Sequence, residues 1–432
     1  MNLGGRVVCG GCGTPAPDGA DLPTRCTAAR EADDVDHVLV RELDLEGTRF
    51  PFDGDGSPWV RYRELLYAWR AARRAGAADE AWCDAAAELD RRLEATGIGG
   101  AWPTPLAPRP KLAAALGRGE LWVKDETTGV GGTHKARHLV PLALHRLALA
   151  PPKPPRLAVA SCGNAALAAA GLARACGWPL EAHVPADIAP SVAARLEDLG
   201  ARLVRCPRDP TPGDPCRRSF LAALDEGALP FSCQGDAHGL AIEGGASLVW
   251  EVVSERGLGA PPLDHVVVQV GGGALASAVL TGFRDALALG AIGRLPRVHC
   301  VQGAGCAPLA AAWERLRESG DLDPGGIAAA RRRRGEVMVP WPTTPAGAAG
   351  GLLDDETYDW AALVAGMAET GGAPLVVSDD ELVGACEAAA AHAGVSVDPS
   401  GAAGLAGWAR LCAEGAIGAA ERSLVLFTGA PR

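Results

Sequence analysis

The chain has 432 residues, more than one ordinary hydrophobic core holds, so two or three domains are expected. Its 41 basic and 52 acidic residues give a formal net charge of −11, which argues against sequence-independent binding of nucleic acid. No run of about 20 apolar residues is present and no apolar segment follows the first residues, so we expect neither a membrane span nor a secretory signal, and a cytoplasmic protein.

Residues 1–100 differ from the rest of the chain and are predicted to be an N-terminal extension packed on a catalytic body. Cys9 and Cys12 form a Cys-x2-Cys pair, and Cys26 and His37 could raise the number of ligands to the four that structural zinc requires. The second cysteine pair of such a zinc knuckle is not completed at Cys26. A loop with free thiols is therefore the favoured interpretation, and no bound metal is predicted.

From residue 101 onward, strand and helix signals alternate along the chain. Strands are expected over 121–124, 157–160, 180–184, 201–206, 265–270, 297–302 and 423–427. Helices, two of them in the extension, are expected over 61–75, 78–95, 133–147, 164–176, 189–199, 216–226, 239–256, 274–288, 307–318, 378–393 and 400–412. The alternation predicts an α/β protein with two open, twisted, mainly parallel sheets, in which ligands bind beyond the carboxyl ends of the strands.

Residues 319–357 interrupt this alternation and are predicted to be a long loop or a partly ordered insertion. The segment contains four consecutive arginines, Arg331–Arg334. Such a run is expected to be a solvated charge cluster, and the alternative is a clamp for an anionic substrate. His238, upstream of this segment, is expected at the protein surface.

Lys135 is the first candidate for chemistry. It follows the short strand 121–124 and the glycine-rich turn Gly131-Gly132-Thr133, and it stands where a helix begins. A lysine amine can form a Schiff base with a carbonyl compound, whereas most lysines only point into solvent. The loops further along the chain favour the chemical role, because they supply the other parts of a cofactor site.

Two of these loops follow strands and open helices, where backbone N–H groups favour an anion. The first loop consists of Ser161, Cys162, Gly163, Asn164 and Ala165. An N-capping serine with a glycine turn is its alternative interpretation. The second loop consists of Gly271, Gly272, Gly273 and Ala274, whose glycines let the backbone close around a phosphate. A dinucleotide site is the rival there, but Ala276 stands where Gly-x-Gly-x-x-Gly has its third glycine.

Taken in order, these segments resemble the fold-type II enzymes that depend on pyridoxal 5′-phosphate (PLP), and the subgroup they resemble most is threonine-synthase-like. His134-Lys135 resembles the His-Lys pair of the tryptophan synthase β subunit, and Lys135-Ala136-Arg137 resembles the Lys-x-Arg of threonine synthases and serine/threonine dehydratases. Further matches lie at 243–247, 398–402 and Thr428-Gly429. His138 departs from the pattern, which usually has glycine after Lys-x-Arg.

The resemblance implies a role for each candidate residue. Lys135 is expected to hold PLP as a Schiff base and then to act as the catalytic base, and Thr428 is expected to meet the pyridine nitrogen. Asn164 is expected to contact the PLP 3′-oxygen. The phosphate is expected on Gly271, Gly272, Gly273 and Ala274, with His134 either capping it or serving a structural role. The substrate carboxylate is expected on the amides of Ser161, Cys162, Gly163, Asn164 and Ala165.

The residue at the pyridine nitrogen also bears on the type of reaction. A hydroxyl such as that of Thr428 cannot hold a full proton on this nitrogen, which suits elimination and replacement better than transamination. We therefore predict a PLP-dependent carbon–oxygen lyase that deprotonates Cα of an amino acid and carries out β- or γ-elimination or replacement. The alternatives are a serine/threonine dehydratase, a β-replacement synthase of specialised metabolism, and a non-catalytic PLP-binding regulator.

The resemblance also implies a domain organisation and an assembly. A small domain is expected over 137–229, and a large PLP domain is expected to combine 101–136 with 230–432. The cofactor is expected in the cleft between them, and the protein is expected to be a homodimer.

Overall fold

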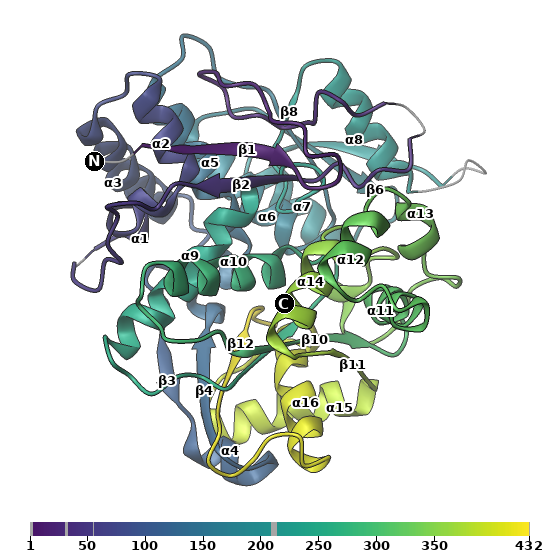
Figure 1. Cartoon of the computed structure of the whole chain (residues 1–432). Helices are drawn as coiled ribbons and strands as arrows, with labels where there is room; N and C mark the ends of the chain where they lie inside the picture. The colour runs from purple at the N-terminus through teal and green to yellow at the C-terminus, as the bar shows by residue number, and fades with distance from the viewer. Residues whose placement is uncertain (1–2, 31–32, 55, 209–213, 432) are drawn as a thin grey trace.

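The computed structural model describes residues 3–30, 33–54, 56–208 and 214–431 (Figure 1). In this part of the chain the strands form three sheets, of two, six and four strands. The larger two consist almost entirely of parallel strands joined by helices. The predicted α/β fold with open, mainly parallel sheets is therefore confirmed.

The six-stranded sheet has the strand order β11-β10-β9-β12-β4-β3. Its strands are β3 (Leu106–Pro108), β4 (Glu120–Asp125), β9 (His265–Gln269), β10 (Arg297–Gly303), β11 (Pro374–Val377) and β12 (Arg422–Phe427). Neighbouring strands pair in parallel except at the edge, where β3 runs antiparallel to β4. Every residue of β9 is buried, as expected for a strand that is covered on both faces of the sheet.

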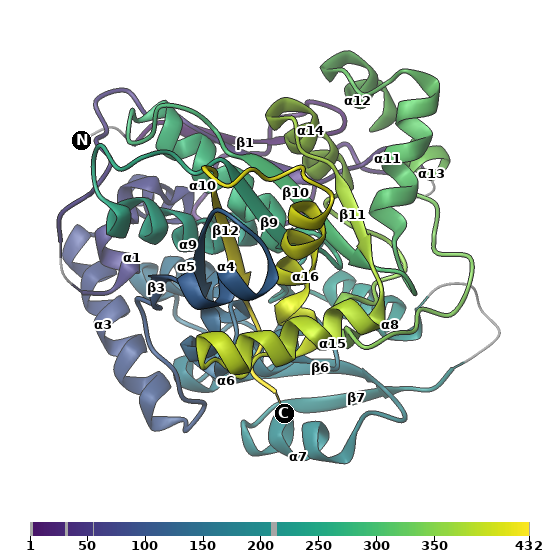
Figure 2. The same cartoon turned by 90° about the horizontal axis from the view of Figure 1, so that it is seen from below.

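Helices cover both faces of this sheet (Figures 1 and 2). One face carries α4 (Pro110–Leu116), α15 (Asp379–Ala388) and α16 (Pro399–Ala413), and the other carries α9 (Ala241–Arg256), α10 (Ala274–Ala288) and α14 (Trp360–Thr370). Trp408 of α16 and Phe427 of β12 belong to one apolar core, whereas Trp250 of α9 and Leu280 of α10 belong to the other. The sheet is thus held rigidly between two packed layers.

The four-stranded sheet has the order β7-β6-β5-β8, and all its strands are parallel. Its strands are β5 (Leu157–Ala160), β6 (Leu180–Pro185), β7 (Arg202–Cys206) and β8 (Leu229–Pro230). The helices of this region are α5 (Lys135–Leu149), α6 (Asn164–Cys176), α7 (Pro190–Asp198) and α8 (Pro215–Asp225). The alanine-rich sequence of α6 suits its almost complete burial, because small side chains let neighbouring elements approach closely.

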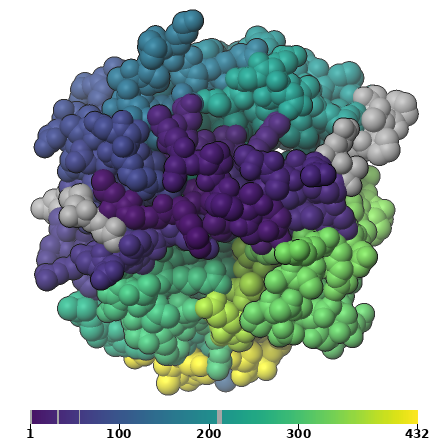
Figure 3. Space-filling view, turned by 45° about the horizontal axis from the view of Figure 1, so that its top comes forward, coloured from purple at the N-terminus to yellow at the C-terminus, as the bar shows by residue number. Residues whose placement is uncertain are grey.

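The N-terminal extension contains a hairpin that the sequence analysis does not predict. Strands β1 (Gly5–Cys9) and β2 (Leu39–Leu43) pair in antiparallel fashion. The helices α1 (Pro58–Arg61), α2 (Tyr67–Arg74) and α3 (Asp79–Ala95) follow, and the side chains of Trp59, Trp69 and Trp82 are fully buried. Figure 3 shows the extension as a band that lies across the face of the molecule. Its buried side chains belong to the same apolar core as those of later elements.

The prediction of a long loop over 319–357 is wrong in part. After α11 (Pro308–Ser319), the segment contains α12 (Pro324–Ala330), α13 (Arg334–Val337) and the 3-10 turn η4 (Gly350–Leu352). The expectation of a solvated arginine run is also wrong. Arg331, Arg333 and Arg334 form ion pairs with Asp36, Asp321 and Glu356, respectively. Asp36 is distant in sequence, and Asp321 and Glu356 lie 12 and 22 residues from their arginines. A local sequence pattern therefore does not predict these ion pairs.

Shorter elements complete the described chain. These are the 3-10 turns η1 (Arg63–Leu65), η2 (Glu126–Thr128) and η3 (Val130–Gly132), and the π-helical turn η5 (Ala389–Ala393). The helix expected over 378–393 therefore changes to π geometry in its last turn. No helix in the described residues is long and apolar enough to cross a membrane.

His238 is buried, contrary to the surface position expected from the sequence, and lies near the buried His145. Burial, with a smaller contribution from the nearby Arg146, lowers the pKa of both imidazoles to about 4. In the folded protein the pKa of each imidazole is below the ordinary value of 6.5. The contribution of the two neutral histidines to the free energy of unfolding is therefore fully present above pH 6.5 and is lost as the pH falls from 6.5 toward 4.

We therefore expect the free energy of unfolding to fall with acid by about 1.4 kcal/mol per pH unit for each of these histidines. Denaturant unfolding at a series of pH values from 7 to 4.5 measures this slope. The double substitution His145→Leu, His238→Leu should flatten it, whereas substitution of the exposed His392 by leucine should not. An unchanged slope in the double variant contradicts the prediction.

Candidate active site

The carboxyl ends of β5, β9 and β12 open onto one cavity of about 340 Å³. Every residue that the sequence predicts for the cofactor or substrate lines this cavity: His134, Lys135, Ser161, Cys162, Gly163, Asn164, Ala165, Gly271, Gly272, Gly273, Ala274 and Thr428. These residues come from both large sheets. Their convergence follows from the parallel topology, which places strand–loop–helix junctions at a common edge.

Lys135 is the first residue of α5, and the loop before it is held by the end of the chain. Thr133 pairs with Gly429 in an isolated bridge, and the backbone N–H of Ala430 donates to the Gly132 carbonyl at 2.9 Å. The segment that follows β12 therefore fixes the position of Lys135 at the cavity wall.

The loop after β5 presents a helix N-terminus to the cavity. Helix α6 begins at Asn164, and no side chain caps its N-terminus at Gly163. The first N–H groups of a helix have no partner within the helix, so they are available for an anion. Ser161 turns its hydroxyl toward the loop itself, where Oγ accepts from the Gly163 N–H at 3.3 Å. The loop thus offers backbone donors suited to a carboxylate.

The glycine loop after β9 has no room for side chains. A methyl group on Gly271 would stand 2.6 Å from Asp354 Oδ2, and one on Gly272 would stand 2.8 Å from Tyr358 Cδ2. Gly273 has a φ of +103°, which L side chains rarely adopt. The backbone N–H of Gly272 donates to the Asp354 carboxylate, so this loop already holds an anionic group.

Asp354 brings a titratable group to the glycine loop. Burial raises its pKa to about 6, although Lys135 and the Gly272 N–H act in the opposite direction. Asp354 is therefore mostly ionised at neutral pH. A phosphate bound at the same loop would have to replace this carboxylate.

Thr428 ends β12 and is oriented by a buried glutamine. Gln269 Nε2 donates to Thr428 Oγ1 and to the backbone carbonyls of Gly401 and Leu426, each at 3.1 Å. Because the threonine oxygen accepts from this amide, its own proton is left to donate to a group in the cavity.

His134 lies next to Lys135 and is neutral. Burial lowers its pKa well below the ordinary value, and the neighbouring Lys135 and His138 lower it further. Its Nδ1 lies 3.3 Å from the Thr428 carbonyl and donates to it, which leaves Nε2 as an acceptor. Nε2 is buried without a hydrogen-bond partner in the described residues. The imidazole thus offers an acceptor and no positive charge to the cavity.

Arg137 does not reach the cavity, although it belongs to the Lys-x-Arg segment. Its guanidinium is completely buried and pairs with Glu126 at 2.7 Å and with Glu251 at 2.8 Å. These carboxylates raise the pKa of Arg137 against the opposing effect of burial. Arg137 therefore anchors the first turn of α5, and with it Lys135, to α9.

The Glu-Gly segment at 243–247 also has a structural role. Glu243 accepts from the backbone N–H groups of Tyr67 at 2.7 Å and Ala68 at 2.9 Å, so it binds the start of α2 in the N-terminal extension. His138, which departs from the family pattern, fits because Gly245 has no side chain. A methyl group on Gly245 would stand 2.4 Å from His138 Cε1.

The sequence analysis missed several residues that line the cavity: Arg217, Gln269, Asp354, Tyr358 and Ser400. Gln269 has a visible signal, because it is a polar residue at the end of an otherwise apolar strand. Ser400 lies in the segment 398–402 that matches the family pattern. Asp354 and Tyr358 have no local signal, since they reach the cavity through the folding of the insertion.

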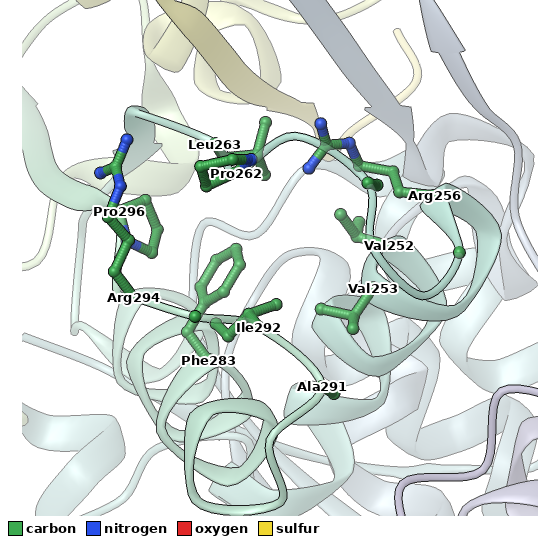
Figure 4. A pocket seen from close by; sticks show the side chains of 13 residues that line it. Val252, Val253, Arg256, Pro262, Leu263, Phe283, Ala291, Ile292, Arg294 and Pro296 are labelled. Atoms are coloured by element: carbon green, nitrogen blue, oxygen red, sulfur yellow. The ribbon is translucent and has the colours of Figure 1, made fainter.

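A second cavity, of about 290 Å³, lies elsewhere in the molecule (Figure 4). It is lined mainly by apolar side chains such as Val252, Phe283 and Ile292, with Arg256 and Arg294 at its edge. None of the predicted site residues contributes to it. Its lining contains no side chain that commonly serves as a nucleophile or a base.

Comparisons with known proteins agree with this assignment. The chain is 27% identical to the threonine synthase of Methanocaldococcus jannaschii over 188 residues, which are 44% of this chain and 41% of that protein. It is 24% identical to the threonine synthase of Methanosarcina acetivorans over 334 residues, which are 76% of this chain and 74% of that protein.

The fold resembles that of the processed form of threonine deaminase isoform 2 from Solanum lycopersicum. The TM-score is 0.59 at 17% identity, over 80% of this chain and 89% of the tomato chain. Residues 98–429 match the family model described as pyridoxal-phosphate dependent enzyme. This match covers most of the chain and every residue of the cavity around Lys135, and the chain therefore belongs to the pyridoxal-phosphate dependent enzyme family.

Proposed function

We propose that this chain is an amino-acid lyase in which Lys135 carries the cofactor and performs the proton transfers. The observation that carries the proposal is the position of Lys135, between a glycine loop that holds an anion and a threonine hydroxyl free to donate. When bound, PLP supplies an electron sink for negative charge that develops at Cα of an amino acid.

The residues of the cavity fit this cofactor. The loop 271–274 offers backbone donors to a phosphate at the start of α10, once the Asp354 carboxylate has moved away from the Gly272 N–H. Thr428 offers a proton to a ring nitrogen, and Asn164 at the start of α6 offers an amide to a ring oxygen. The neutral His134 supplies no positive charge for the phosphate.

The substrate is proposed to bind by its carboxylate at the N–H groups of 161–165. This anchor would orient Cα of the substrate toward Lys135. The free amine of Lys135 would then take the proton from Cα. We propose that the reaction is a β- or γ-elimination or replacement, and the similarity to two threonine synthases and to a threonine deaminase supports this proposal.

Removal of the Thr428 hydroxyl should weaken this reaction. We expect Thr428→Val to lower kcat/KM by about 10- to 100-fold, the effect of losing one hydrogen bond to a buried acceptor. Thr428→Ser keeps the hydroxyl and should retain most of the activity. Steady-state kinetics of the two variants test the expectation. An equal loss of kcat/KM in both variants would show that the Thr428 methyl group matters and that its hydroxyl proton does not.

The first experiment is a visible absorption spectrum of the purified protein with PLP, recorded before and after addition of a panel of amino acids and O-phosphorylated amino acids. A band that shifts with one substrate supports the proposal and identifies the substrate class. Analysis of the products as a 2-oxo acid and ammonia, or as a replaced amino acid, then separates elimination from replacement. A band that no amino acid shifts would favour a non-catalytic PLP-binding regulator.

We propose a large lobe built on the six-stranded sheet and a small lobe built on the four-stranded sheet, with Lys135 at their junction. We propose a homodimer from the family resemblance, to be tested by light scattering. A reducing compartment such as the cytoplasm suits the chain because its 13 cysteines are all free.

A further inference from the structure

The N-terminal extension brings together four side chains that are chemically suited to a metal. Cys9 and Cys12 lie in the turn that ends β1, Cys26 lies in the following loop, and His37 lies just before β2. Their ligand atoms all lie within 4.8 Å of one another. The incomplete cysteine pair of the sequence is thus complemented by a histidine from the other strand of the hairpin.

Two of the distances between ligand atoms in this cluster are close to those of a tetrahedral site. Cys12 Sγ lies 3.6 Å from Cys26 Sγ, and Cys9 Sγ lies 3.3 Å from His37 Nδ1. Around a tetrahedral zinc ion, two sulfur ligands stand about 3.8 Å apart, and a sulfur and a nitrogen ligand stand about 3.6 Å apart. A disulfide bond between Cys12 and Cys26 would need about 2.05 Å between the sulfurs.

The surroundings of the cluster support ligands rather than independent thiols. The Cys12 N–H points at Cys9 Sγ at 3.5 Å, which stabilises a thiolate at that position. His37 Nε2 lies 3.0 Å from Asp33 Oδ2, so a carboxylate orients the imidazole and leaves Nδ1 to face the sulfurs. Asp33 is itself fixed by the backbone N–H of Arg30 at 3.0 Å.

The turn between the two cysteines is packed too closely to be a free loop. A methyl group on Gly11 would stand 2.4 Å from the Asp36 carbonyl oxygen. The Gly10 N–H donates to the Val38 carbonyl at 2.8 Å, which binds the turn to the start of β2. The backbone therefore holds the turn with Cys9 and Cys12 against the segment that carries His37.

We propose that Cys9, Cys12, Cys26 and His37 bind one structural zinc ion. Three sulfur ligands and one nitrogen ligand in tetrahedral arrangement suit Zn²⁺, and four protein ligands leave no open position for catalysis. The site ties three segments of the extension together. It lies next to Asp36, whose backbone N–H donates to the Arg331 carbonyl at 2.7 Å, so it also secures the extension against the insertion.

Metal analysis of the purified full chain tests the proposal independently of its enzymatic activity. We expect one zinc per chain by mass spectrometry, and loss of this zinc in Cys26→Ser. Cys83→Ser, which removes a partly buried cysteine outside the cluster, should keep the zinc. Zinc retained by Cys26→Ser, iron in place of zinc, a Cys12–Cys26 disulfide bond, or a metal-free chain with all thiols titratable would each overturn the proposal.

Two variants that preserve most of the cluster separate ligation from folding. Asp33→Asn should weaken zinc affinity by about 10- to 100-fold, measured by competition with a chromophoric chelator, because only the orientation of His37 is disturbed. His37→Cys should still bind one metal ion, and after exchange into cobalt its absorption bands should differ from those of the unsubstituted chain. Identical cobalt spectra would show that His37 is not a ligand.

Discussion

Lys135→Ala is expected to lose all measurable turnover, a fall of at least about 10³-fold. The substitution removes both the amine that holds the cofactor and the base that moves the Cα proton. No other side chain can take over, because the chain has four lysines and only Lys135 lines the cavity. Lys124 is buried against Glu251 and Glu255, and Lys111 and Lys153 are exposed.

Because the chain has only four lysines, the lysine that binds PLP can be identified chemically. Reduction of the PLP-loaded protein with borohydride, followed by peptide mass spectrometry, should place the cofactor on the peptide that contains Lys135. Lys153→Ala is the matched control and should retain both the label and the turnover. Label on another lysine, or turnover by Lys135→Ala, would remove Lys135 from the mechanism and with it the proposed function.

The part of the site that follows strands was predictable from the sequence. Each of the loops at Ser161 and Gly271 follows a short apolar strand and begins a helix, and Thr428 directly follows the last strand. In a parallel sheet these junctions share one edge, so local patterns were sufficient to bring distant residues together. The roles of these residues stay predictions, but their convergence on one cavity is a property of the fold.

Other parts of the site depend on tertiary contacts that leave no local pattern. Asp354 reaches the glycine loop because the insertion is held there, through Arg334 with Glu356 and through the Thr357 hydroxyl, which donates to the Gly271 carbonyl at 3.1 Å. The β1–β2 hairpin joins two short strands separated by an irregular loop. The ion pairs of the arginine run 331–334 also depend on tertiary contacts, so composition alone could not assign these arginines to their acidic partners.

The buried ion-pair network beneath Lys135 leads to the second large expected effect. Glu251 is almost completely buried, at 2% exposure, and binds two cations. Its carboxylate lies 2.8 Å from Arg137 and 2.8 Å from Lys124. Arg137 and Lys124 lower the pKa of Glu251 against the effect of burial, so the group is ionised in the folded protein.

We expect Glu251→Ala to destabilise the protein by about 3–5 kcal/mol, because the buried cations Arg137 and Lys124 lose the carboxylate that they share. Each cation then keeps a single charged partner, Glu126 for Arg137 and Glu255 for Lys124. Glu255→Gln is the matched control. Glu255 also pairs with Lys124, but its side chain is 33% exposed, so its loss should cost less than about 1 kcal/mol. Denaturant unfolding of the two variants at neutral pH measures the difference, and equal costs would mean that solvent compensates the buried cations.

The same substitution should affect the active site through Arg137, which anchors the turn that carries Lys135. In Glu251→Ala, Arg137 keeps only Glu126 as a charged partner, at 2.7 Å, so it loses its ion pair with α9 and keeps there only its hydrogen bond to Ser247, at 3.1 Å. We therefore expect a lower kcat even under conditions where the variant is fully folded. Glu255→Gln leaves this link intact and should not change kcat, so the two variants together separate positioning of Lys135 from general stability.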